Sequence, residues 1–76
     1  MTPAQAATTH MSVCVNGEPR RIRAGLTLDQ LVATLTSAPS GVAAALNEGV
    51  VPRGQWQDTR LGEGDRIEVL TAVQGG

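Results

Sequence analysis

The pair Asn16-Gly17 constrains the fold of this chain more than any other feature of the sequence. The residues before it, Met11–Val15, alternate between apolar and small or polar side chains, which is the pattern of a strand with one buried face. Asn and Gly supply the two positive φ angles of a type I′ turn, which joins neighbouring antiparallel strands. We therefore predict a β-hairpin. Its second strand, Glu18–Arg23, is expected at a sheet edge because Pro19 has no amide proton to donate.

The segment after the hairpin has the signature of an amphipathic helix. Thr27 stands three residues before Gln30, so the two residues can form a capping box at the start of the helix. Asp29 in the first turn is favourable for the helix dipole. Turn-forming residues in Ser37–Gly41 are expected to end the helix. One apolar stripe recurs at helical spacing and is expected to pack on a sheet: Leu28, Leu31, Val32 and Leu35.

Three further strands are predicted after the helix. The first is Val42–Asn47, and Glu48-Gly49 turns the chain into a second strand that Pro52 ends. Gly54–Gln57 is interpreted as a loop or a single helical turn. The last strand is Arg66–Val73.

This order of elements predicts an α+β fold, a mixed sheet of four to five strands with one helix packed across one face. The first and last strands are expected to be central and parallel, because the helix provides the crossover that parallel pairing requires.

Composition excludes several classes of function. A chain of 76 residues forms one small domain with little room for an enzyme pocket, so we do not expect an enzyme. A net charge of −1 and a single tryptophan give no footprint for nucleic acid. One cysteine can form neither an internal disulfide nor a zinc site, and no apolar run is long enough to span a membrane. We expect a cytoplasmic protein, monomeric on its own, without a bound metal or cofactor.

The N-terminal residues 1–10 carry no periodic pattern and no signal peptide, and we predict a disordered extension followed by one domain, residues 11–76. The periodic pattern begins at Met11, which is interpreted as the true or an alternative start of the protein.

The chain ends in Gly75-Gly76, directly after a predicted strand. This ending and the order of elements resemble the ubiquitin-like β-grasp superfamily. Within it the chain is most similar to ThiS-type sulfur carriers of thiamine biosynthesis. The residues that carry the resemblance are MSVCVNGE at the hairpin, LTLDQLV at the helix, VAAALNEGVVPRGQW in the middle and LGEGDRIEVLTAVQGG at the end.

The resemblance implies a carrier whose chemistry takes place at the C-terminus. The carboxylate of Gly76, exposed by the Gly75-Gly76 tail, would be adenylated with ATP by a ThiF-type adenylating enzyme. Sulfur from a cysteine desulfurase would then convert it to a thiocarboxylate. A thiazole synthase would use that sulfur to build the thiazole ring of thiamine.

The predicted partner surface lies near this tail. On the last strand, Ile67 and Val69 are expected to face the helix, which leaves Leu70 and Ala72 on the opposite, uncovered face. Trp56 is interpreted as closing one end of the core or as an anchor for a partner, and Arg53 as a surface contact or a solvated charge. The predicted partner-binding residues are Leu70, Ala72, Val73, Gln74, Arg53 and Trp56.

Other functions stay open from the sequence. The same carrier chemistry could serve molybdopterin, cysteine or another sulfur-containing metabolite. A ubiquitin-like binding module whose tail is never activated, or a protein conjugated to lysines, would share the fold. Cys14 invites a role in persulfide chemistry, but its place in the middle of a strand favours a small packed side chain.

Overall fold

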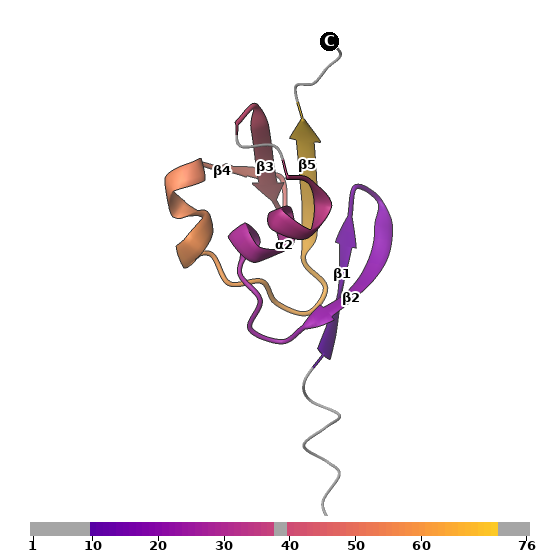
Figure 1. The fold of residues 1–76 in the computed structure, drawn as a ribbon. Coiled ribbons are helices and arrows are strands. Elements are labelled where there is room, and N and C mark those ends of the chain that lie inside the picture. Colours follow the sequence, from indigo (N-terminus) through magenta and orange to yellow (C-terminus); the bar gives the residue numbers. More distant parts are fainter. Residues whose placement is uncertain (1–9, 38–39, 72–76) are drawn as a thin grey trace, which may run out of the picture.

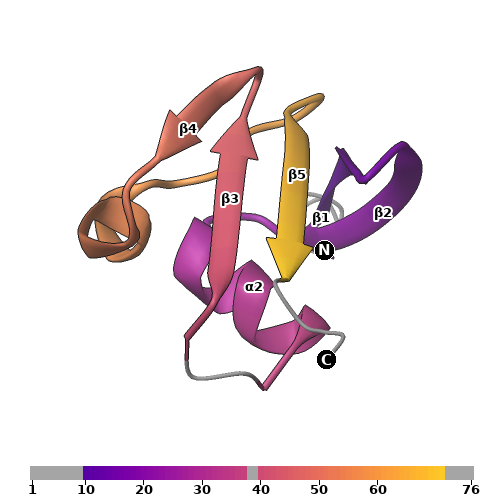
Figure 2. The same cartoon turned by 90° about the horizontal axis from the view of Figure 1, so that it is seen from above.

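The fold is a five-stranded mixed sheet with one α-helix across one face (Figures 1 and 2). The computed structural model describes residues 10–37 and 40–71. Strand order is β2-β1-β5-β3-β4, in which β1 and β5 are parallel and the other neighbouring pairs are antiparallel. The predicted α+β class, with its parallel first and last strands, is confirmed. The elements are β1 (His10–Val15), β2 (Glu18–Arg23), α2 (Leu28–Leu35), β3 (Val42–Leu46), β4 (Gly49–Val51), the 3-10 helix η1 (Arg53–Asp58) and β5 (Arg66–Thr71).

The first hairpin forms as its sequence predicts. Asn16 and Gly17 have φ angles of 52° and 87°, so both turn residues adopt the left-handed conformation that a type I′ turn requires. The strand before them begins at His10, which corrects the predicted extension of residues 1–10 by one residue. The rest of that extension lies outside the described residues. As predicted, β2 is an edge strand, and Pro19 is paired with Cys14 on one side only.

Helix α2 begins with the predicted capping box. The Thr27 Oγ1 accepts a hydrogen bond from the Gln30 amide at 3.3 Å, and the Gln30 Oε1 accepts one from the Thr27 amide at 3.0 Å. The helix ends at Leu35 because Thr36 is already extended, with φ −154° and ψ 148°; its amide still bonds the Val32 carbonyl. The apolar stripe packs on the sheet, and its first residues, Leu28 and Leu31, are fully buried.

The second tight turn differs from the prediction by one residue. Asn47 and Glu48 occupy it, with φ angles of 50° and 75°, and Gly49 already belongs to β4. The glycine suggested a turn at Glu48-Gly49. The Asn47 side chain explains the actual position, because its Oδ1 accepts from the Arg66 amide at 2.9 Å and its Nδ2 donates to Asp65 Oδ1 at 3.1 Å. A residue that tolerates the left-handed region and can bond a neighbouring strand therefore fixes the turn.

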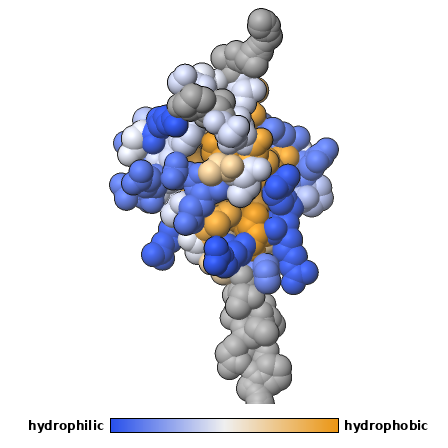
Figure 3. Space-filling model, viewed as in Figure 1, coloured by the Kyte–Doolittle hydropathy of each residue, from blue (hydrophilic) through white to orange (hydrophobic). Residues whose placement is uncertain are grey.

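One hydrophobic core fills the space between the helix and the sheet. Its buried members come from every element except β4, and all the described buried residues are apolar. On the helix side of the molecule, hydrophobic residues form a central band bordered by hydrophilic ones (Figure 3). The core consists of Val13, Val15, Ile22, Leu28, Leu31, Val32, Ala44, Trp56, Leu61, Ile67 and Val69.

Candidate functional site

Strand β5 leads directly into the C-terminal tail, so the residues around its end form the candidate site. The predicted alternation along β5 is confirmed: Ile67 and Val69 are buried against the helix, whereas Leu70 is 71% exposed. The predicted site residues Ala72, Val73, Gln74, Gly75 and Gly76, and the last two residues of the predicted strand, lie outside the described residues.

Leu70 belongs to an apolar patch on the face of the sheet that carries no helix. It lies opposite the exposed Ala43 of β3, and Ala45 lies opposite Val50 of β4. Val50 is 79% exposed; with Leu70 it makes up the large exposed hydrophobic side chains of the described residues. These four residues, Ala43, Ala45, Val50 and Leu70, are called the sheet patch below. Val50 was not predicted as part of a partner surface. The alternation of a strand could have indicated it, because Val50 points to the opposite face of the sheet from the half-buried Val51.

Three connections hold β5 in place beneath this patch. On one side it pairs with β3, from Leu46 opposite Ile67 to Val42 opposite Thr71. On the other side β1 pairs with it only at Cys14 and Val15. Beyond that point the chain turns away into β2, and side-chain hydrogen bonds take over from the ladder.

The Asn16 side chain continues the pairing that β1 begins. Its Oδ1 accepts a hydrogen bond from the Val69 amide at 2.9 Å, and its Nδ2 donates to the Val69 carbonyl at 3.3 Å. The Asn16 backbone amide also donates to the Ile67 carbonyl at 2.8 Å. One turn residue thus secures three backbone groups of β5 close to the tail. The sequence indicated the turn but not this clamp, because the two residues are 53 positions apart.

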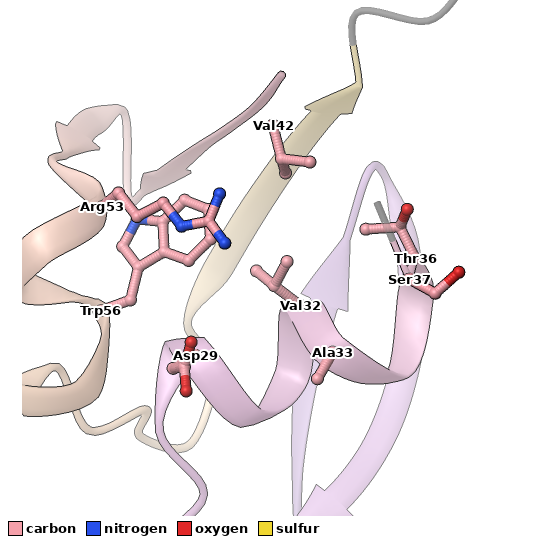
Figure 4. Close-up of a pocket in the computed structure, with 8 residues that line it drawn as sticks. All are labelled: Asp29, Val32, Ala33, Thr36, Ser37, Val42, Arg53 and Trp56. Carbon is pink, nitrogen blue, oxygen red and sulfur yellow. The ribbon is translucent and has the colours of Figure 1, made fainter. Parts of the chain in front are cut away.

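Arg53 and Trp56 lie together at one end of the core (Figure 4). Trp56 is 2% exposed, and its Nε1 donates to the Val51 carbonyl at 2.8 Å. Of the two interpretations of Trp56, burial fits the one in which it closes the core. Arg53 remains exposed, with its guanidinium carbon 5.2 Å from the centre of the indole ring. Burial of Trp56 therefore leaves Arg53 as the member of this pair that can contact a partner, and stacking on the ring restricts its position.

A cleft of about 360 Å³ opens beside this pair, between α2, η1 and the start of β3. Asp29 and Arg53 are its charged lining residues, and Val32 and Trp56 contribute apolar walls (Figure 4). The cleft holds no grouping of nucleophile and base. In the described part of the chain, no three His, Cys, Asp or Glu side chains lie close enough together to hold a metal ion. Within the same residues, no helix is long and apolar enough to cross a membrane.

Cys14 lies half-buried on the sheet, close to the ion pair between Arg66 and Glu48, whose Nη2 and Oε2 atoms are 3.2 Å apart. Cys14 is the next-to-last residue of β1, and its half-buried place in the strand agrees with a small packed side chain.

Comparison with known proteins decides the family. The model of the ThiS family matches residues 13–76, which is most of the chain. The sulfur carrier protein ThiS of Escherichia coli is 32% identical over 66 residues, which cover 87% of this chain and all of that protein. The chain belongs to the ThiS family. The predicted resemblance and the predicted function as a sulfur carrier of thiamine biosynthesis are thereby confirmed.

Two further comparisons concern the fold and the pathway, one with a ThiS structure and one with a thiazole synthase. The crystal structure of the thiamine biosynthesis protein ThiS from Geobacter metallireducens superposes with a TM-score of 0.72 at 30% identity, covering 87% of this chain and all of that one. This likeness confirms the β-grasp fold. A thiazole synthase of Magnetococcus marinus is 42% identical over 66 residues; the chain spans only 20% of that protein's length.

Proposed function

We propose that the protein carries sulfur as a thiocarboxylate on Gly76 and delivers it for the thiazole ring of thiamine. The observation that supports this assignment is the extent of the family match, which continues through residue 76 and so includes the Gly75-Gly76 tail. The family match therefore extends over the tail as well as over the folded domain.

The chemistry at Gly76 needs an activated carboxylate. The Gly76 carboxylate attacks the α-phosphate of ATP, pyrophosphate leaves, and a mixed anhydride with AMP forms. The terminal sulfur of a desulfurase persulfide then attacks the carbonyl carbon and AMP leaves. Reduction of the resulting acyl disulfide by a thiol releases the thiocarboxylate. The phosphate-binding groups, the metal and the persulfide cysteine are supplied by partner enzymes, so this chain is a co-substrate and not an enzyme.

The composition of the tail suits this role. Two residues without a β-carbon can enter a channel too narrow for other side chains, and no side chain shields the carboxylate. Ordering such a tail costs binding free energy, which docking of the folded domain must offset. We assign that docking to the sheet patch around Leu70, extended by Ala72, Val73 and Gln74, with Arg53 as a peripheral contact. Because the reaction consumes ATP, the cytoplasm is the expected compartment.

The thiazole synthase relative supports the choice of pathway. A segment that makes up 20% of that relative's length aligns with this protein. Covalent fusion keeps two domains at a high effective concentration, which benefits a donor and its acceptor. We therefore propose a thiazole synthase as the acceptor, a ThiF-type enzyme as the activator and a cysteine desulfurase as the sulfur source.

The experiment that tests the assignment measures ATP–pyrophosphate exchange by a purified ThiF-type enzyme in the presence of this protein. The full chain should support exchange, and a chain lacking Gly75-Gly76 should not. Arg20→Ala is the matched control, since Arg20 is exposed on β2 outside the assigned docking surface and the variant keeps the tail and its terminal glycines. Equal exchange with and without the two glycines would contradict the assignment and favour a binding module that is never activated.

A further inference from the structure

Strand β5 keeps one backbone edge free at its C-terminal end. In an antiparallel pair, the N–H and C=O groups of one residue point toward the neighbouring strand, and those of the next residue point away from it. The backbone groups of Arg66 point toward β3, because its carbonyl accepts from the Asn47 amide at 2.7 Å. Those of Ile67 and Val69 point away from β3, because both residues bond Asn16. By this register Thr71, two residues further on, directs both backbone groups away from β3.

Nothing in the described part of the chain bonds these two groups of Thr71. Strand β1 is the neighbour of β5 on this side, but it ends at Val15, and β5 extends beyond that point (Figure 1). The Asn16 side chain satisfies Val69 and reaches no further along β5. Thr71 is exposed, and so is its neighbour Leu70. The position beside Thr71 is therefore an open place in the sheet, in line with β1 and next to the sheet patch.

We propose that this open edge of β5 accepts an extended strand of the adenylating partner. A strand placed there would pair its own N–H and C=O groups with those of Thr71. It would occupy the line of β1 beyond Asn16, and a side chain on its outer face would reach the neighbouring Leu70. Pairing at Thr71 would anchor the last described residue of β5 to the partner. This inference rests on the proposed function, since it specifies how the activating partner grips the tail.

Strand addition has a readout that docking on the sheet patch alone does not have. In the free protein the Thr71 amide should exchange with deuterium within the dead time of the experiment, whereas the Leu70 amide, which faces β3, is protected. We expect saturating ThiF-type enzyme to slow exchange at Thr71 at least tenfold and to leave Leu70 as slow as before. Exchange read by mass spectrometry with electron-transfer fragmentation separates the two amides. Unchanged exchange at Thr71 in a saturated complex would overturn the proposal.

A variant pair tests the same edge through affinity. Thr71→Pro removes the outward N–H and places a ring where the added strand would lie, while the bonds to β3 are retained because Thr71 makes none there. Thr71→Val keeps the N–H and serves as the control. We expect the proline variant to bind the ThiF-type enzyme about tenfold more weakly than the valine variant, with both unfolding at similar temperatures. Equal affinity of the two folded variants would contradict strand addition.

The inference and the proposed function fail separately. If deletion of Gly75-Gly76 abolishes pyrophosphate exchange and Thr71→Pro binds normally, the carrier function stands and the strand-addition site falls. If the glycine deletion leaves exchange intact, the proposed function falls whatever Thr71 does. Protection of Thr71 by a thiazole synthase but not by the ThiF-type enzyme would overturn the assignment of the partner.

Discussion

Replacing Leu70 by alanine tests whether the sheet patch docks the activating partner. The substitution removes three carbons, each worth about 0.8 kcal/mol when buried. Because the side chain is 71% exposed in the free protein, burial in a complex can recover about that share, or ~1.7 kcal/mol. This free energy corresponds to an affinity for the ThiF-type enzyme about fifteenfold weaker. The fold should be almost unaffected, since substitutions of exposed side chains change stability by about 0.5 kcal/mol or less.

Isothermal titration of the ThiF-type enzyme with the wild type and the variant measures this difference, and thermal unfolding of both proteins confirms that they are folded. Arg20→Ala is the matched control, since Arg20 is an exposed long side chain on β2 with the parity of the buried Ile22, so it lies on the opposite face. We expect the control to bind within about twofold of the wild type, because it removes no apolar carbon that the proposed complex would bury. A Leu70→Ala protein that is folded and binds as tightly as the control would refute the assignment of the patch.

Three predictions concern stability and are checked by thermal unfolding. Asn16→Gly keeps the turn conformation but removes both side-chain hydrogen bonds to Val69. We expect the free energy of unfolding to fall by about 2 kcal/mol and the unfolding midpoint to fall by about 8–16 °C. A shift below about 2 °C would show that the clamp contributes little. Thr27→Ala removes half of the capping box and should cost about 1 kcal/mol, or about 4–8 °C; an unchanged midpoint would contradict a stabilising cap. Glu48→Gly should instead raise the unfolding midpoint by about 4–8 °C, because a φ of 75° strains a residue with a β-carbon by about 1 kcal/mol. The exposed ion pair with Arg66 that the variant loses is weak. A lower midpoint would show that the ion pair outweighs the strain.

The sequence predicted the features that depend on contacts between residues close together in the chain. The turn at Asn16-Gly17 and the capping box at Thr27 each depend on residues at most three positions apart, so their signals stand in the sequence itself. The alternation along β5 was equally legible, and it placed Leu70 on the uncovered face.

The parallel pairing of the first and last strands was predicted, but finer details that depend on contacts between distant segments were not. The turn at Asn47-Glu48 is fixed by bonds to Asp65 and Arg66, about 18 residues away, and the nearby glycine pointed to the wrong pair. The Asn16 clamp and the open edge at Thr71 follow from how far β1 accompanies β5, which no short window of sequence contains. The choice between the two interpretations of Trp56, closing the core or anchoring a partner, likewise needed the path of the chain from β4 to η1 to be known.

The intact mass of the protein after incubation with ATP, a cysteine desulfurase, a thiol reductant and the ThiF-type enzyme tests the central claim most directly. The account predicts a species heavier by the difference between one sulfur and one oxygen atom, with the change located on Gly76 by fragmentation, and absent from a chain that lacks Gly75-Gly76. Protein of unchanged mass, recovered from a mixture in which the same enzymes convert a known ThiS carrier, would contradict the claim that this chain carries sulfur.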